Sequence, residues 1–414
     1  MSKKLNLTTK IFIALILGVI TGLILHPMKD NPFVSKYLLN FVFNLLGNGF
    51  VRAIRMVVVP LVLCSLVIGA AGIEDVTKLG RIGVKTLIFY LSTTAFAVIL
   101  ALVGGNIINP GRGVNIGDIA VSQVTVSETK PFVDILLDMI PINPAEAMAT
   151  GNMLQIIVFA ILVGVALSLL GDKASNIKKV FEEGNALSLQ LVEIIMIFAP
   201  FGVYGLISKT FTTLGYVALL PLFKYFIGVV IILFIHCLVT YQGILVLFGK
   251  YNPIKFFKSF APTMMVGFST ASSSACLPSS LKSMQETFGV SKAISSFTIP
   301  LGNTINMDGT AVMQGVATIF IAQIYGIDLT MGNYITIILT ATLASIGTAG
   351  VPGVGVIMLG MVLVQIGLPL EGIGLVMGID RFVDMFRTMI NITGDAVCTL
   401  VIAKTEGEQL KEAI

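Results

Sequence analysis

Apolar stretches long enough to cross a lipid bilayer recur along this sequence, and they constrain its fold more than any other feature. A helical span needs about 20 predominantly apolar residues. Only 12% of the 414 residues are charged, whereas a soluble domain carries about 25%. A membrane β-barrel would instead show alternating segments of about ten residues. The sequence therefore predicts an all-α polytopic membrane protein, in contact with the lipid bilayer along most of its length.

Six conventional spans are expected before the pattern changes. They cover about residues 11–25, 41–71, 84–108, 153–170, 186–207 and 219–248. Basic residues gather in the loops after the second, fourth and sixth spans, and the positive-inside rule places such loops in the cytoplasm. The N-terminal segment lacks a convincing small-residue cleavage site, so we interpret it as a retained first helix. Both chain termini are expected to be cytoplasmic.

Two later apolar segments are interrupted by small residues and proline. Residues 259–282 contain GFSTASSSACLPSS, with basic residues on both sides, and residues 335–366 contain SIGTAGVPGVG. Broken backbone at membrane depth is tolerated only where it lies within protein or lines a cavity. We expect two re-entrant hairpins, at 252–286 from the cytoplasm and at 331–368 from outside.

Each hairpin is followed by a helix with a central polar motif. The first is TINMDGT in the span at about 294–324, and the second is MINITGD in the last helix, 378–404. A hairpin and its following helix thus occur twice, and the two hairpins enter the membrane from opposite sides. This is the inverted repeat of secondary transporters. Small residues that only permit close helix packing would explain one tip, but explain two such units poorly. The sequence predicts eight spans plus the two hairpins.

The last helix carries a polar stripe in an otherwise apolar setting. Asp384, Arg387, Thr388, Asn391 and Asp395 fall at relative positions 0, 3, 4, 7 and 11, within a wedge of roughly 100°. Intramembrane charges usually line a substrate or ion path. Asp384 can hold an ammonium group and Arg387 can grip a carboxylate at two points, which suits an acidic amino acid. The alternative is that these two side chains merely pair with each other.

Asp308 and Asp395 have no basic partner at helical spacing. A buried unpaired carboxylate is either protonated or bound to a cation, and hard cations prefer oxygen ligands. Neighbouring side chains and the carbonyls of the hairpin tips offer such oxygens. The third span also carries a polar cluster, which alone more often reflects helix packing: Tyr90, Thr93 and Thr94.

Other classes of function fit the sequence less well. An intramembrane aspartyl protease could use Asp308 and Asp395, but the GxGD context is absent. Ser272 to Ser274 have no histidine partner motif, so we expect no enzyme activity. A simple channel does not need two hairpins that suggest alternating access. The four cysteines show no CxxC spacing, so neither a disulfide nor a metal cluster is expected, and nothing indicates nucleic-acid binding or an organic cofactor.

At NMDGT, the Ser-rich tip, GTAGVPG and RTMINITGD the chain resembles the glutamate transporter family of dicarboxylate/amino acid:cation symporters, over essentially its full length. The resemblance implies a homotrimer in the cell membrane whose protomers each work as an elevator. Residues 1–75 and 111–215 would form a scaffold. Residues 76–110 and 216–414 would form the moving transport domain, with the second hairpin as its outer gate.

The resemblance implies sodium-coupled symport of L-aspartate or L-glutamate into the cell. The alternatives are a proton-coupled C4-dicarboxylate symporter and a sodium-coupled carrier of neutral amino acids or cystine. The substrate-binding residues carried over by motif are Ala271, Ser272, Ser273, Thr310, Val351, Gly355, Asp384, Arg387, Thr388 and Asn391.

The same resemblance implies three sites for co-transported sodium ions. The first would use Gly302, Asn306, Asn391 and Asp395. The second would use carbonyls of Thr304, Ser345, Ile346 and Thr348, near Met307. The third would use Tyr90, Thr93, Thr94, Asn306 and Asp308. All these side chains are present, which favours sodium over proton coupling.

The chain departs from the family pattern in one respect. Acidic amino-acid carriers usually place a second arginine beside the substrate aspartate, at positions that here are Ala271 and Met385. Arg381, one turn earlier on the last helix, is a candidate replacement. Carriers of C4-dicarboxylates tend to lack the aspartate at 384, and carriers of neutral amino acids tend to lack the arginine at 387. This chain has both, so acidic amino acids are the leading prediction.

Overall fold

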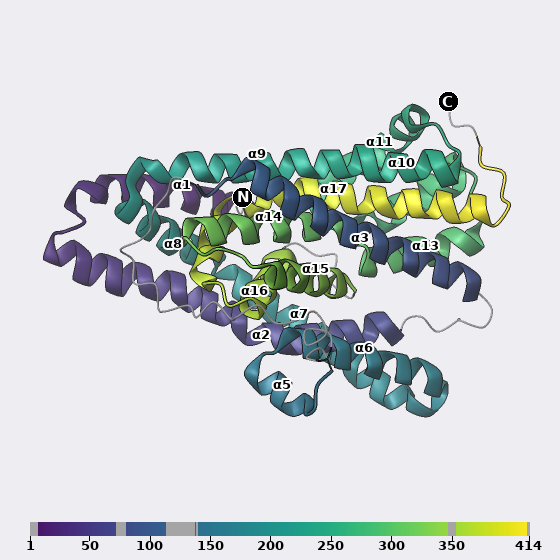
Figure 1. The fold of residues 1–414 in the computed structure, drawn as a ribbon, viewed down its shortest axis with the longest axis horizontal. Coiled ribbons are helices and arrows are strands. Elements are labelled where there is room, and N and C mark those ends of the chain that lie inside the picture. Colours follow the sequence, from purple (N-terminus) through teal and green to yellow (C-terminus); the bar gives the residue numbers. More distant parts are fainter. Residues whose placement is uncertain (1–6, 72–79, 113–136, 138–139, 347–352, 412–414) are drawn as a thin grey trace, which may run out of the picture.

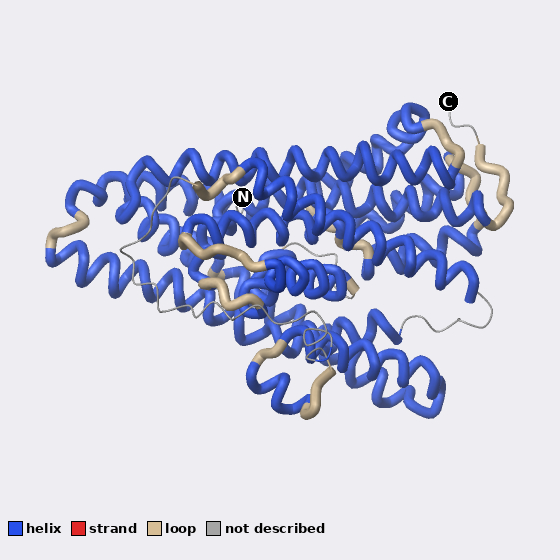
Figure 2. Tube along the Cα trace, viewed as in Figure 1, coloured by secondary structure: helices blue, strands red, loops and turns tan. Residues whose placement is uncertain are grey.

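The computed structural model describes residues 7–71, 80–112, 137, 140–346 and 353–411, and in this part of the chain every regular element is a helix (Figure 2). Five helical runs are long and apolar enough to cross a membrane. They are Thr9–Met28, Arg81–Ile108, Gln155–Ile195, Leu220–Gly249 and Leu370–Thr405. An all-helical membrane protein is thereby confirmed, whereas the eight spans and two re-entrant hairpins remain predictions.

One group of packed helices comes mainly from the first half of the chain. Its members are α1 (Leu7–Leu25), α2 (Asn44–Ala71), α6 (Met153–Leu170), α7 (Ser175–Ile197) and α8 (Ala199–Leu214). Helix α1 packs on α8, and α2 packs on α6, α7 and α8. Glycines permit the closest approaches between helices. A Cβ at Gly205 of α8 would lie 2.9 Å from the Phe43 carbonyl oxygen, just before α2, and 2.9 Å from the Gly47 nitrogen in the first turn of α2.

A second group is built around α17 (Ile373–Thr405), the yellow helix of Figure 1. The others are α3 (Gly80–Ile108), α9 (Leu219–Ile235), α11 (Pro253–Thr270), α12 (Ser273–Lys282), α13 (Lys292–Ile305), α14 (Asp308–Ile324), α15 (Met331–Ser345) and α16 (Val354–Gln365). Helix α17 contacts α9, α11, α13, α14 and α16. It is almost wholly buried, so its polar stripe faces protein rather than lipid.

Short elements connect these helices. They are η1 (His26–Met28), η2 (Val34–Phe43), α5 (Pro144–Thr150), η3 (Gly171–Ala174), η4 (Gly215–Ala218), η5 (His236–Tyr241), α10 (Gln242–Ile244), η6 (Leu245–Gly249), η7 (Ser283–Thr287) and η8 (Leu370–Gly372). The sixth expected span is therefore a continuous helix with two π-helical stretches, η5 and η6.

The fifth span was expected as one segment at 186–207, and this prediction is wrong. Helix α7 begins at Ser175 and ends at Ile197, and α8 starts afresh at Ala199. Pro200 lies in the first turn of α8, where its missing N–H and fixed φ are tolerated, whereas inside a continuous helix they would break a hydrogen bond. The fourth expected span agrees with α6, Met153–Leu170.

The two helices with central polar motifs differ in continuity. The TINMDGT motif breaks its helix, because α13 ends at Ile305 and α14 begins at Asp308, with Asn306 at ψ 91° and Met307 at φ −118°. The backbone carbonyls at the end of α13 are thereby released from helical pairing. The MINITGD motif lies within unbroken α17. Its carbonyls instead stay in the helix, and its side chains supply most of the polar groups.

Candidate functional site

The charged centre of α17 is a buried cluster around Arg387, which is 1% exposed. Its Nη2 donates to Asp384 Oδ1 at 2.6 Å, and its Nη1 lies 3.2 Å from Asp380 Oδ1. Arg381 approaches Asp384 Oδ2 from the other side, at 3.5 Å. The structure therefore shows Asp384 and Arg387 paired with each other. A buried ion needs such a partner of opposite charge.

This pairing leaves part of the guanidinium unused. Among the described residues, Nε of Arg387 has no partner, and Nη1 has only its ion pair with Asp380. Gly355, in the first turn of α16, packs directly on the guanidinium, because a Cβ there would lie 2.6 Å from Nη1. Helix N-termini attract anions. Arg387 and the start of α16 therefore form a place where a carboxylate would be stabilised from two sides.

Asn391 links α17 to the break between α13 and α14. Its Oδ1 accepts a hydrogen bond from the amide of Gly309 at 2.7 Å, and its Nδ2 lies 3.3 Å from Met307 Sδ. Gly309 has no room for a side chain, since a Cβ would lie 2.6 Å from the Arg387 carbonyl oxygen. Thr310 lies next to this contact, with its hydroxyl 3.9 Å from Met307 Sδ. Thr388 is buried one turn before Asn391 along the stripe.

The first hairpin tip lies between α11 and α12, both of which pack on α17. Ala271 ends α11 in the left-handed conformation, with φ 49°, and the Ser272 side chain caps α12 by accepting from the amide of Ala275. Ser273 is buried at the start of α12. The tip thus presents the N-terminus of α12, the end of a helix that attracts anions.

Asp395 and Asn306 form the centre of the first oxygen-rich set. Nδ2 of Asn306 donates to Asp395 Oδ1 at 2.8 Å and to the Asn391 carbonyl at 3.0 Å. Gly302 lies directly beside the Asp395 carboxylate, and its carbonyl accepts the last hydrogen bond of α13, from the amide of Asn306 at 2.7 Å. Oδ1 of Asn306 is buried and has no hydrogen-bond partner among the described residues. The structure therefore brings together the whole set predicted for the first cation.

Asp308 is the centre of the other set, and it is fully buried. The Thr94 hydroxyl lies within hydrogen-bond distance of Asp308 Oδ1 and of the Tyr90 carbonyl. Thr93 also donates to that carbonyl, at 3.1 Å. The Tyr90 hydroxyl instead donates to the Thr298 carbonyl, so Tyr90 offers only its backbone oxygen here.

Two neighbours of Asp308 were not predicted. The Tyr241 hydroxyl donates to Asp308 Oδ2 at 2.8 Å, and His236 Nε2 lies 3.0 Å from the same oxygen. They could not be inferred from the sequence, because residues five apart lie on different faces of an α-helix. No pattern at α-helical spacing would have found them.

The remaining expected cation set is incomplete in the described part of the chain. Thr348 and also Val351, a predicted substrate residue, lie outside the described residues. Ser345 and Ile346 end α15, where the Ser345 hydroxyl donates to the Thr342 carbonyl. The Thr304 hydroxyl turns back to the Pro300 carbonyl within α13, which leaves the carbonyl of Thr304 as its candidate ligand.

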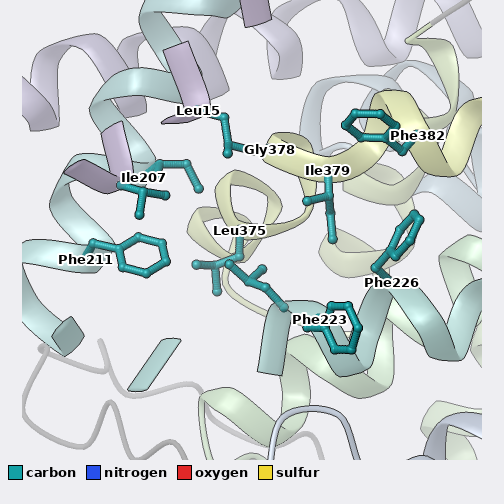
Figure 3. Close-up of a pocket in the computed structure, with 11 residues that line it drawn as sticks. Leu15, Ile207, Phe211, Phe223, Phe226, Leu375, Gly378, Ile379 and Phe382 are labelled. Atoms are coloured by element: carbon teal, nitrogen blue, oxygen red, sulfur yellow. The ribbon is translucent and has the colours of Figure 1, made fainter. Parts of the chain in front are cut away.

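A cavity of about 380 Å³ lies elsewhere, between α1, α8, α9 and α17 (Figure 3). Its lining includes Leu15, Phe211, Phe226 and Phe382, and every lining residue is apolar or glycine. A charged solute would lose its hydration there without gaining a partner. The cavity is therefore separate from the polar cluster and does not suit an acidic solute.

Comparison with known proteins gives a consistent result. Residues 7–405 match the model of the sodium:dicarboxylate symporter family. A proton/sodium-glutamate symport protein of Bacillus caldotenax is 36% identical over 99% of this chain and 97% of its own length. A proton/glutamate-aspartate symporter of Escherichia coli (strain K12) is 35% identical, covering 97% and 93%. A C4-dicarboxylate transport protein of Bacillus subtilis (strain 168) is 33% identical, covering 97% and 94%.

Proposed function

The chain belongs to the sodium:dicarboxylate symporter family, and from that premise we propose that it couples the uptake of L-aspartate or L-glutamate to the entry of sodium. The family consists of membrane symporters, and the glutamate and aspartate carriers among the relatives support an acidic amino acid. A dicarboxylate carrier is nearly as similar. The choice between substrates must therefore rest on the site.

The observation that carries the proposal is the buried Asp384–Arg387 pair, in which Nε of the guanidinium has no partner among the described residues. A substrate carboxylate can accept from Nε–H of Arg387 and, once Asp384 turns to the substrate, from Nη2–H on the same edge of the guanidinium. An ammonium on the same molecule can then take its place beside Asp384. Each buried charge keeps a partner throughout this exchange, which avoids the large cost of an unpaired one. A C4-dicarboxylate has no ammonium and would leave Asp384 facing another anion.

The second carboxylate of the substrate would meet the first hairpin tip. The start of α12 at Ser272 and Ser273 offers backbone amides and the positive end of a helix dipole. Thr310, Thr388 and Asn391 would add neutral hydrogen bonds. Arg381, at 3.5 Å from Asp384, supplies positive charge from α17, and we propose it in place of the arginine missing at Ala271 and Met385.

Sodium coupling is supported by the oxygen sets at Asp395 and Asp308. Each carboxylate is buried without a Lys or Arg partner among the described residues, and each is surrounded by carbonyl, hydroxyl or amide oxygens. The unpaired Oδ1 of Asn306 suits a cation held by several oxygens. A proton carrier would require only one carboxylate, and that carboxylate would not need to be surrounded by oxygen ligands.

The division of the chain supports an elevator mechanism within a homotrimer. The group with α1, α2, α6, α7 and α8 corresponds to the proposed scaffold. The group around α17 corresponds to the proposed transport domain, with residues 252–286 and 331–368 as its hairpins. Substrate and sodium would move together with this second group, because its helices carry every described residue of the proposed sites.

Uptake of radiolabelled L-aspartate into proteoliposomes tests the proposal. An imposed sodium gradient should drive accumulation, whereas potassium alone should not. Accumulation driven only by a proton gradient would contradict sodium coupling. If succinate accumulates and aspartate does not, the second candidate function, proton-coupled C4-dicarboxylate symport, takes its place; the similarity to the dicarboxylate carrier supports that candidate.

A further inference from the structure

We propose that His236 and Tyr241 are positioning residues for Asp308, which hold one carboxylate oxygen so that the other faces a coupled cation. The inference rests on the proposed sodium symport. Both residues lie on η5, the π-helical stretch of His236–Tyr241 that follows α9. Neither was assigned a role from the sequence.

The backbone of η5 explains how two residues five apart reach one atom. In an α-helix such residues point about 140° apart. A π-helical turn closes with an i→i+5 hydrogen bond, and here the amide of Gln242 donates to the Cys237 carbonyl. The His236 and Tyr241 rings meet edge to face, with centroids 4.6 Å apart. The rare backbone form therefore serves to bring both rings to the same side.

Both rings end on Asp308 Oδ2, Nε2 of His236 at 3.0 Å and the hydroxyl of Tyr241 at 2.8 Å. His236, Tyr241 and Asp308 are each 0% exposed. A carboxylate oxygen only accepts hydrogen bonds, so Nε2 carries the hydrogen. Nδ1 of His236 has no partner among the described residues. An apolar residue would pack there at less cost, so the contact with Asp308 is the reason for a histidine.

The consequence falls on the opposite oxygen. The last torsion of an aspartate side chain is broad, so the two donors fix the orientation of the carboxylate plane. With one oxygen held by His236 and Tyr241, the other faces the Thr94 hydroxyl, which also lies within hydrogen-bond distance of the Tyr90 carbonyl. Hydrogen-bonded partners behind a ligating carboxylate typically change cation affinity by about 10–100-fold when removed.

Tyr241 also connects this carboxylate to α17. A Cβ on Gly394 would lie 2.5 Å from Tyr241 Cζ and 2.6 Å from Asn306 Nδ2. Gly394 therefore leaves the space into which Tyr241 extends, immediately before Asp395. The ring stands between the two oxygen-rich sets, so its position affects both.

The test compares variants that remove or retain the donors. His236→Leu removes the N–H, His236→Gln retains one, and Tyr241→Phe removes only the hydroxyl. His26→Leu and Tyr251→Phe are matched controls, because each loses a hydrogen bond to a backbone carbonyl far along the chain from Asp308. The measurement is the sodium concentration for half-maximal aspartate uptake, with the aspartate KM taken at saturating sodium.

We expect His236→Leu and Tyr241→Phe to raise the half-maximal sodium concentration at least about tenfold. His236→Gln should restore it to within about threefold, and neither control should move it. The aspartate KM at saturating sodium should stay within about twofold. A purely structural role would lower the maximal rate of all three variants without shifting sodium dependence, and that result would overturn the inference.

Failure of the proposed function is distinguishable from failure of the inference. If the unsubstituted protein shows no sodium-driven uptake, sodium symport is refuted. The inference is then decided by the thermal stabilisation of purified protein by NaCl relative to choline chloride. A tenfold weaker sodium response of His236→Leu supports it. An equal response, or no sodium response in the unsubstituted protein, overturns it.

Discussion

Arg387 and Asp384 lie one turn apart on α17 and share a hydrogen bond of 2.6 Å, with both side chains buried. This pair keeps two opposite charges stable inside the protein when no solute is bound. It also leaves Nε of Arg387 without a partner among the described residues, while Nη1 pairs with Asp380 at 3.2 Å. A zwitterionic solute can therefore enter by exchange of partners rather than by uncovering a charge.

Replacement of the guanidinium tests that exchange. Arg387→Cys should weaken aspartate uptake by about 10–100-fold in kcat/KM, because a charge-assisted hydrogen bond contributes about 1.5–3 kcal/mol. Uptake of alanine or serine should change far less. Arg112→Cys is the control, because Arg112 is exposed beyond the end of α3 and belongs to none of the proposed sites. Equal losses for acidic and neutral substrates would contradict the assigned role.

The close packing of α16 on Arg387 gives a second prediction. Gly355→Ala places a Cβ 2.6 Å from Nη1, which should displace the guanidinium and raise the aspartate KM about tenfold or more. Gly243→Ala is the control, because nothing lies within 4 Å of the added Cβ. Radiolabelled aspartate uptake at saturating sodium measures both. An unchanged KM in Gly355→Ala would remove Gly355 from the substrate site.

Asp395 should decide sodium dependence. Asp395→Asn keeps the side-chain shape but removes the negative charge, so the half-maximal sodium concentration should rise about tenfold or more, as expected for a lost carboxylate ligand. Asp328→Asn, at an exposed position between α14 and α15, serves as the control. Sodium-dependent uptake is the measurement, and an unaltered sodium response would exclude Asp395 from the cation site.

The end of α17 carries a pH-dependent contact with α3. Lys85 lies 2.6 Å from Glu406, and Arg81 pairs with the same carboxylate. Hydrogen bonds from Lys85 and then Arg81 lower the pKa of Glu406 below its ordinary 4.5. A lowered pKa in the folded state means that the stabilisation is complete above 4.5 and is lost as the pH falls through the lowered value.

Glu406→Gln should therefore lower the melting temperature above pH 5 and have no effect once the carboxylate is protonated. The effect should not exceed about 2 °C, because solvent screens a pair in which Arg81 is largely exposed. Melting curves of the detergent-purified protein at pH 7 and at pH 3 measure it. Glu182→Gln, at an exposed position on α7, is the control. A difference that grows toward acid pH would contradict the sign.

The substrate stripe could be predicted from the sequence because its members belong to one helix. Helical periodicity places Asp384, Arg387, Asn391 and Asp395 on one face whatever surrounds them, and α17 holds them on a buried face. The bounds of α6 followed in the same way from its apolar run. The prediction of the fifth span was wrong, because a proline near the middle of an apolar stretch does not show whether one helix kinks there or one helix ends and another begins.

Contacts between distant segments could not be predicted from periodicity. Asp308 meets His236 and Tyr241, 72 and 67 residues away, only because η5 adopts a π-helical turn against α14. The family resemblance predicted that Asp308 lies beside Thr94. It gave no indication that His236 and Tyr241 also contact Asp308. Neither the unpaired Nε of Arg387 nor the unpaired oxygen of Asn306 can be read from composition or spacing.

By itself the sequence determined that the chain spans a membrane, which polar residues share a helix face, and which family it resembles; the match over residues 7–405 confirmed that family. These properties follow from apolar length and from the period of the α-helix, which are local. Only the tertiary structure decided which protein donors hold the carboxylate of Asp308, and that Gly355 and Gly394 leave room for Arg387 and Tyr241. Those outcomes depend on how helices from different parts of the chain pack, since hydrogen-bond geometry is fixed only when both partners are in place.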